Sequence, residues 1–106
     1  MRELTIEQIL SVIQELNEEY AGTGFKLVGV FGSYARGENA PTSDIDIAYE
    51  IDQQRFHKDN AFAQLEEMGK IRTVLEKRFQ RKVDLVSFKS NNIVFKERIS
   101  KEMLTA

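Results

Sequence analysis

The sequence predicts an α/β protein built on a single small mixed β-sheet of three or more strands, with helices packed against one face. Two observations lead to this prediction. Short runs of apolar residues, typical of strands, alternate along the chain with longer segments whose apolar residues recur at helical spacing. The length of 106 residues leaves room for one modest core, so we expect a single domain over residues 1–106.

The first segment carries the signals of a helix that begins after Thr5. Thr5 is a suitable N-cap residue, and Gln8 three residues later completes a capping box. Gly22 and Gly24 are expected to end the helix. Its apolar stripe consists of Ile6, Ile9, Leu10, Ile13, Leu16 and Tyr20.

Three further segments are predicted to form strands. Residues 25–31 are a short apolar run that follows a turn signal, and residues 82–88 are a second such run. Between them, residues 44–51 alternate strictly, so their aspartates take one face of the sheet and their isoleucines the other. Residues 32–43 are polar and contain glycine, which indicates a loop with room for one helical turn.

Residues 60–79 are predicted to form a long helix, and a final helix follows that either Ser90 or Asn91 would cap. Gly69 inside the long helix should cost about 1 kcal/mol relative to alanine unless another group packs closely against it. The stripe of the long helix consists of Phe62, Leu65, Met68, Ile71, Leu75 and Phe79. The final helix carries Ile93, Val94, Ile99 and Met103.

The composition excludes several classes of protein. The chain has no cysteine, which rules out disulfides, thiolate zinc sites and cysteine nucleophiles. No apolar run approaches the roughly 18 residues of a membrane-spanning helix. The amino terminus also lacks the apolar core of a signal peptide. These features favour a cytoplasmic protein that does not bind membranes.

The charge is distributed unevenly along the chain. Residues 1–53 hold three basic against ten acidic residues, and residues 54–106 hold twelve against seven. The basic residues gather between Lys70 and Lys82, which indicates either a charged partner or the solvated face of a helix, with the second favoured. Because aromatic residues suitable for stacking are scarce in this stretch, direct binding of nucleic acid is not expected.

Residues able to bind phosphate follow directly after the first predicted strand. Gly32 at a strand end lets the backbone turn sharply and approach a ligand. Ser33 adds a hydroxyl group and Arg36 a fixed positive charge. Free backbone amides in such a turn can bind phosphate. Taken alone, however, this segment is better interpreted as an ordinary glycine-rich turn.

Three aspartates add a second signal. Asp44 and Asp46 lie two residues apart on one strand, so their carboxylates point the same way, an arrangement that suits Mg²⁺. The alternative is an exposed edge strand that uses charge to deter aggregation. Asp84 interrupts the apolar third strand and is a third candidate ligand. The alternative role for Asp84 is an ion pair with a lysine or arginine of the basic second half of the chain. If these strands are neighbours, three carboxylates beside a phosphate-binding turn suit two-metal phosphoryl or nucleotidyl transfer.

The combined pattern resembles the signature of a known superfamily. Gly32-Ser33 followed after ten residues by Asp44-x-Asp46 is similar to the motif of the DNA polymerase beta-like nucleotidyltransferases, and in particular of their smallest branch, the minimal nucleotidyltransferases. Residues 82–86 resemble the strand that carries the third carboxylate in that branch, and residues 95–104 resemble its terminal helix. The resemblance therefore implies the nucleotidyltransferase (polymerase beta-like) fold.

The resemblance also implies an activity, namely the magnesium-dependent transfer of AMP from ATP, with two Mg²⁺ ions in the site. Gly32 and Ser33 would hold the β- and γ-phosphates of the nucleotide. The implied nucleotide-binding residues are Gly32, Ser33, Arg36 and Ser43. The implied catalytic and metal-binding residues are Asp44, Asp46 and Asp84.

A partner protein is implied as well. Minimal nucleotidyltransferases commonly pair with a small all-helical HEPN protein, a ribonuclease toxin, for which they act as the antitoxin. The resemblance thus implies AMP transfer to a hydroxyl of such a toxin, namely that of a tyrosine. Two alternatives stay open. The chain could neutralise its toxin by binding alone, with little or no catalysis. It could instead adenylylate a small hydroxylated acceptor such as an aminoglycoside.

Overall fold

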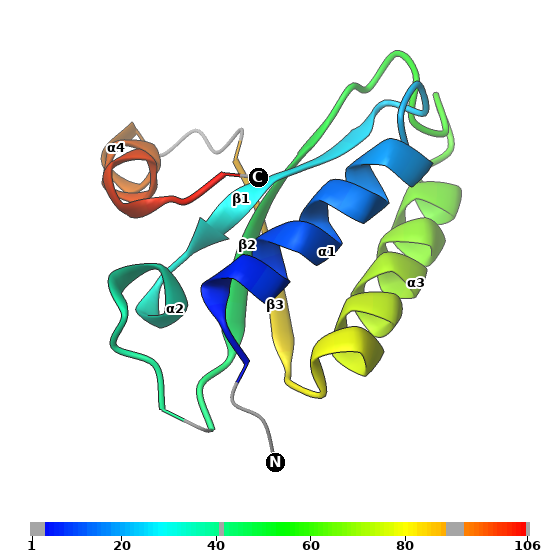
Figure 1. The fold of residues 1–106 in the computed structure, drawn as a ribbon. Helices are drawn as coiled ribbons and strands as arrows, with labels where there is room; N and C mark the ends of the chain where they lie inside the picture. The colour runs from blue at the N-terminus through cyan, green and yellow to red at the C-terminus, as the bar shows by residue number, and fades with distance from the viewer. Residues whose placement is uncertain (1–3, 41, 89–92, 106) are drawn as a thin grey trace.

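The computed structural model describes residues 4–40, 42–88 and 93–105 of the chain. The predicted cap of the last helix, Ser90 or Asn91, lies outside these residues, as do the side chains of Ile93 and Val94. In chain order, the elements are α1 (Ile6–Glu19), β1 (Phe25–Phe31), α2 (Ser33–Arg36), β2 (Ile45–Ile51), α3 (Ala61–Phe79), β3 (Val83–Ser87) and α4 (Ile93–Glu102), as Figure 1 shows.

The three strands form one mixed sheet in the order β1-β2-β3. The central strand β2 pairs antiparallel with β1 and parallel with β3. The β1–β2 register shifts between Leu27 and Gly29, so Val28 has no partner opposite it and forms a bulge. This mixed sheet confirms the predicted fold class.

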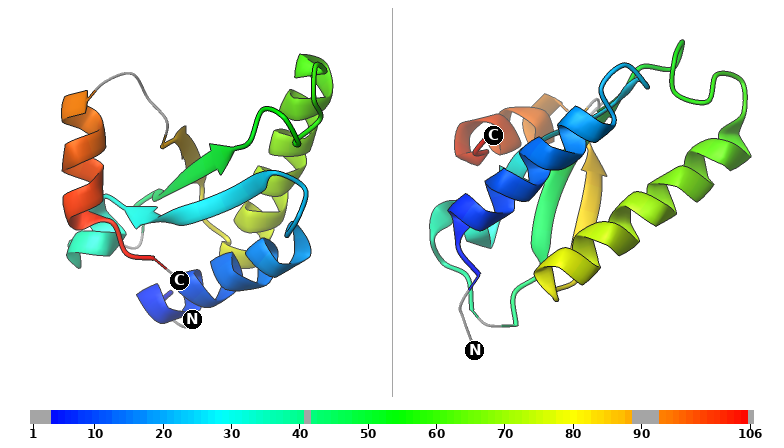
Figure 2. Two further views of the ribbon diagram at one scale, coloured as in Figure 1. Left: turned by 90° about the horizontal axis from the view of Figure 1, so that it is seen from above. Right: turned by 45° about the vertical axis from the view of Figure 1, so that its right-hand side comes forward.

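Helix α1 begins as the sequence predicts. The Thr5 hydroxyl accepts the Gln8 amide at 3.2 Å, and the Gln8 side chain accepts the Thr5 amide at 2.9 Å, which completes the capping box. α1 and α3 lie on the same face of the sheet, and between them and the strands is the larger of two apolar clusters (Figures 1 and 2). The fully covered side chains of this cluster include Ile9, Ile13, Leu27, Val30, Ile45, Ile47, Ile71 and Leu75.

Helix α4 differs from the prediction that the helices pack on one face, because it covers the opposite face of the sheet (Figure 2). Ile99 of α4 packs there against Phe31 and Ala48, with Val28 and Val86 at the edge of the cluster. Val28 lies on this side by alternation from Leu27, the bulge shifts the alternation so that Phe31 also lies here, and Ala48 follows from the alternation of β2. Helix α4 covers these apolar side chains, while the carboxylates of Asp44 and Asp84 at one end of the sheet remain exposed.

The beginning of α3 also differs from the prediction. Phe62 is 78% exposed and Leu65 is 73% exposed, so the buried stripe begins only at Met68. The 19 residues of α3 form a helix about 28 Å long, whereas the five-residue strand β3 spans only about 17 Å. The first turns of α3 therefore extend past β3. Phe56, from the loop before α3, fills the core at this end and is 2% exposed.

The chain after α4 returns to the outer edge of β1. Leu104 and Val30 exchange two backbone hydrogen bonds, at 2.8 and 2.9 Å. A side chain on Gly29 would collide with the Leu104 carbonyl and with Met103, so only glycine permits this close approach. The terminal segment is thereby fixed next to the end of β1. Among the described residues, no helix combines the length and the apolar character needed to cross a membrane.

Two glycine substitutions should change stability in opposite directions. Gly29→Ala is expected to lower the free energy of unfolding by about 1–3 kcal/mol, because the new methyl group meets backbone that cannot move aside. Gly69→Ala should raise it by about 1 kcal/mol, because Gly69 lies in the helix interior with nothing within 4 Å of an added Cβ. Urea denaturation measures both changes. A neutral Gly29→Ala variant would show that the terminal segment does not pack on β1 as described.

Candidate active site

A cleft of about 440 Å³ lies at the edge of the sheet where β1 ends and where β2 and β3 begin. The strand directions create this convergence, since β1 runs against β2 while β3 runs with it. All seven residues singled out from the sequence line the cleft: Gly32, Ser33, Arg36, Ser43, Asp44, Asp46 and Asp84. The remaining lining residues are Phe31 from β1 and three residues of α4, Arg98, Ile99 and Glu102.

Gly32 is required at the end of β1 for two reasons. Its φ of 77° lies in a region that side-chain-bearing residues rarely adopt. A Cβ at this position would also collide with the carboxylate of Asp46. Glycine therefore lets the backbone of the loop lie directly against an acidic side chain of β2. The sequence predicts a close approach of this backbone to a ligand, whereas the close neighbour in the structure is the Asp46 side chain.

The loop after Gly32 is held by one short helix and one buried side chain. α2 covers Ser33–Arg36, and Gly37 ends it in the left-handed conformation, with φ of 71°. The Glu38 amide donates to the Ser33 carbonyl at 2.9 Å. Tyr34 is 5% exposed and packs into the larger core, so it anchors the loop while Ser33 stays half-buried at the cleft.

The carboxylates of β2 and β3 lie side by side. Asp46 is the direct partner of Asp84 in the parallel register, and neighbouring strands are about 4.8 Å apart. Asp44 and Asp84 are exposed, whereas Asp46 is half-buried. Burial, followed by the negative charges of Asp84 and Asp44, raises the pKa of Asp46 above its ordinary value, and the charge of Arg36 offsets only part of this. The sequence-based interpretation of the three aspartates required β2 and β3 to be neighbours, and the structure shows that they are.

Arg36 and Ser43 line the cleft but are engaged by other protein groups. The Arg36 guanidinium pairs with Glu38 at 3.1 Å and with Glu102 at 3.0 Å. These hydrogen bonds, that of Glu102 first, raise the pKa of Arg36 above its ordinary value. The Ser43 hydroxyl accepts the Ala40 amide at 2.8 Å, which closes the turn before β2. Both residues shape the loops around the cleft, and their contact with nucleotide stays a prediction.

The family model described as polymerase beta, nucleotidyltransferase matches residues 7–104. The chain belongs to this family. A relative in Methanocaldococcus jannaschii, provisionally named a protein adenylyltransferase, is 32% identical over 105 residues, which are 94% of this chain and 96% of the relative. A protein adenylyltransferase of Thermococcus cleftensis is 40% identical over 57 residues, which are 50% of this chain and 54% of that protein.

Two solved structures share the fold. One is provisionally described as a minimal nucleotidyltransferase, with a TM-score of 0.74, 24% identity and coverage of 100% of both chains. The other is a chain of a toxin–antitoxin crystal structure with AMP-PNP, with a TM-score of 0.62 and 24% identity over 95% of this chain and 71% of that one. The family resemblance drawn from Gly32-Ser33 and Asp44-x-Asp46 is thus confirmed, and the chain is a nucleotidyltransferase domain.

The donor atoms of this nucleotidyltransferase fit a hard cation, although they do not form a complete cage. Within residues 4–40, 42–88 and 93–105, no three His, Asp or Glu side chains converge closely enough to hold an ion by themselves. Mg²⁺ commonly takes one or two carboxylates and completes its shell with substrate oxygens and water. Burial, together with repulsion from Asp84 and Asp44, raises the pKa of Asp46, and a cation at this position would offset both effects.

The contribution of α4 to the nucleotidyltransferase cleft is not predicted by the site motifs in the sequence. Glu102 and Arg98 line it from a helix about 70 residues beyond the glycine loop. No sequence motif connects the glycine loop with α4, because their contact depends on how α4 packs across the sheet. The one available signal was that residues 95–104 resemble the terminal helix of the family.

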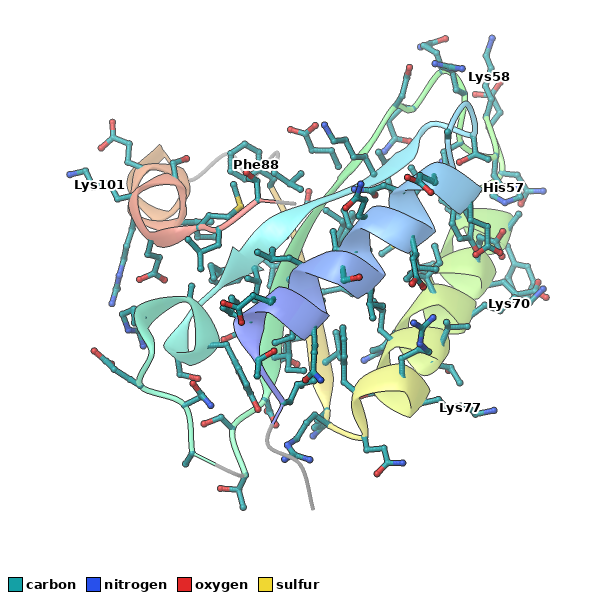
Figure 3. All side chains as sticks on the ribbon, in the orientation of Figure 1. His57, Lys58, Lys70, Lys77, Phe88 and Lys101 are labelled. Carbon is teal, nitrogen blue, oxygen red and sulfur yellow. The ribbon has the colours of Figure 1, made fainter. Side chains whose placement is uncertain are left out.

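Other candidate features of the nucleotidyltransferase domain lie away from the cleft. His57, the only histidine, lies at the opposite end of the molecule from α2 (Figure 3). A larger hollow of about 560 Å³ between α1 and the end of α3 contains a single carboxylate, that of Glu7. No residue from Lys70 to Lys82 lines the cleft.

Removing the Asp46 charge should stabilise the metal-free domain. A carboxyl group whose pKa is higher in the folded state than in the unfolded state opposes folding once both forms are ionised. Asp46→Asn is therefore expected to raise the free energy of unfolding at pH 7 by about 0.5 kcal/mol, the scale of one cross-strand charge repulsion. This gain should disappear as the pH falls below the unfolded-state pKa of an aspartate.

Thermal unfolding in a chelating buffer measures this effect, and Glu50→Gln is the matched control. Glu50 lies on the same strand outside the cleft, so its neutralisation should not produce the gain in stability expected of Asp46→Asn. A loss of stability in Asp46→Asn at pH 7 would mean that Arg36 attracts this carboxylate more strongly than the acids repel it.

Proposed function

We propose that this nucleotidyltransferase transfers AMP from ATP to a hydroxyl group of a partner toxin, and so acts as the antitoxin of a toxin–antitoxin pair in the cytoplasm. The observation that supports this proposal most directly is the joint placement of the glycine–serine loop and three aspartates around one cleft. Transfer of a phosphoryl-type group depends chiefly on positioning and charge neutralisation, and these residues can supply both.

The proposed reaction assigns a role to each group around the cleft. Gly32 and Ser33 would hold the β- and γ-phosphates through the Ser33 hydroxyl and the backbone of the loop, in which the Gly32 amide itself donates to Glu102. The acceptor oxygen forms a bond to the α-phosphorus, the bond from that phosphorus to the bridging oxygen breaks, and pyrophosphate leaves. Asp84 would help to activate the attacking hydroxyl. Ser43 and Arg36 would support the nucleotide from the flanking loops.

Magnesium is part of this proposal. Asp44, Asp46 and Asp84 would hold it, and the residues fit because carboxylate oxygens are the donors that Mg²⁺ prefers. When bound, up to two ions would neutralise the charge of the triphosphate and orient it for in-line displacement. The relatives and solved structures that match this chain support ATP as the nucleotide, since one of those structures contains AMP-PNP.

A protein acceptor is supported by the names of the relatives and by the openness of the cleft. The two relatives described above are named as protein adenylyltransferases, one of them provisionally. The other solved structure belongs to a toxin–antitoxin complex. Asp44 and Asp84 remain exposed at the mouth of the cleft, so a side chain of a second protein can reach them. We propose an all-helical HEPN ribonuclease toxin as the partner and a tyrosine as its modified residue.

The aspartates should be essential for transfer of labelled AMP. With Mg²⁺ and ATP labelled at the α-phosphate, the protein is expected to label one discrete partner protein in an extract of its source cell. The double variant Asp44→Asn, Asp46→Asn should reduce this labelling at least about 100-fold, because it removes the charges that would hold the metal. Gel autoradiography followed by mass spectrometry identifies the labelled protein and residue.

The matched control is Glu50→Gln, a neutralised carboxylate of β2 outside the cleft, which should keep full labelling. Three outcomes would contradict the proposal in different ways. Label on a small molecule would favour an adenylyltransferase for a compound such as an aminoglycoside. Toxin neutralisation that survives the double variant, without label, would favour an antitoxin that acts by binding. Label independent of the aspartates would place the chemistry elsewhere.

A further inference from the structure

The carboxylate of Glu102 contacts the phosphate loop, by which we mean residues 32–37, at two separate points. Its Oε1 accepts the backbone amide of Gly32 at 3.2 Å, and its Oε2 pairs with Nη1 of Arg36 at 3.0 Å. The loop and Glu102 are about 70 residues apart in sequence. One side chain of the last helix thus holds both ends of the turn that the proposed function assigns to the triphosphate.

The position of Glu102 is itself well fixed. Ile99, one turn earlier in α4, is 3% exposed and packs against Phe31 at the end of β1. Two residues after Glu102, Leu104 exchanges two backbone hydrogen bonds with Val30. Glu102 therefore lies between two anchors on β1, next to the point where the phosphate loop leaves that strand. A helix that was loosely attached could not hold the loop in this way.

The charges around Glu102 favour its ionised form. Burial opposes ionisation, but hydrogen bonds from Arg36 and from the Gly32 amide, together with the positive charges of Arg36 and Arg98, lower the pKa of Glu102. From β2, the carboxylate of Asp46 also faces this group. At neutral pH, Glu102 is an anion that accepts two hydrogen bonds from the loop.

We propose that Glu102 is a positioning residue for ATP binding, which holds the Gly32 turn and the Arg36 side chain in the conformation that receives the triphosphate. This proposal rests on the proposed function and extends it to α4. Glu102 acts through the loop, without itself contacting the reacting atoms. Its loss should weaken nucleotide binding more than the rate of transfer from bound ATP, because the three aspartates stay in place.

The contact itself can be tested without nucleotide. In Glu102→Ala, hydrogen exchange at the Gly32 amide is expected to become at least about tenfold faster, since the charged acceptor is lost. Glu102→Gln keeps an acceptor oxygen and should retain part of the protection. Glu97→Gln is the matched control, because Glu97 lies exposed on the same helix, outside the cleft. Nuclear magnetic resonance measures this exchange, and thermal unfolding verifies that each variant is folded.

The consequence for ATP is tested on the same variants by titration with Mg²⁺ and a non-hydrolysable ATP analogue. Glu102→Ala should weaken binding about tenfold, Glu102→Gln by less, and Glu97→Gln not at all. Labelled-AMP transfer at saturating ATP should change by less than about threefold in Glu102→Ala.

Other results would overturn the proposal. Tighter binding in Glu102→Ala would show that the carboxylate competes with phosphate for the loop. Binding equal to that of the unmodified protein, or equal losses in Glu97→Gln, would show that Glu102 does not position the loop. An unmodified protein that binds no ATP would overturn the proposed function, and this proposal with it.

Discussion

The central strand β2 is the constraint on which the rest of the structure depends. Strand β1 runs antiparallel to β2, and β3 runs parallel to it. The end of β1 and the beginnings of β2 and β3 therefore meet at the same edge of the sheet. The glycine loop and the aspartates converge there without any long connection. Gly32 then permits contact, since any side chain at that position would displace the Asp46 carboxylate. A parallel β1 would have placed the loop at the far end of the sheet.

The two faces of β2 have opposite effects on the stability of the fold. Three carboxylates at one edge repel one another, and burial together with this repulsion raises the pKa of Asp46. The opposite face of β2 carries Ile45 and Ile47, neither of which is exposed at all. Burial of these side chains contributes about 2 kcal/mol each, which exceeds the cost of one cross-strand repulsion. The burial of the apolar face of β2 thus offsets the unfavourable repulsion among the aspartates on its other face.

The last helix makes the other contribution to the site. A domain of this size has few elements, and α4 both covers the second apolar cluster and forms one wall of the cleft. The packing of Ile99 and the backbone bridge from Leu104 to Val30 fix that wall to β1. The cleft is therefore lined by segments that lie far apart in the sequence, and Glu102 links the position of the Gly32 turn to the packing of α4.

Local patterns in the sequence determined most of the elements and the candidate site residues. The capping box at Thr5, the alternation along β2 and the spacing from Gly32 to Asp46 are short-range signals that steric and hydrogen-bonding rules interpret directly. Only the tertiary structure decided that α4 crosses to the second face, that Phe56 replaces Phe62 in the core, and that Glu102 reaches Gly32. These features depend on contacts between distant segments, which follow from the relative lengths and packing of whole elements and leave no periodic signal in the chain.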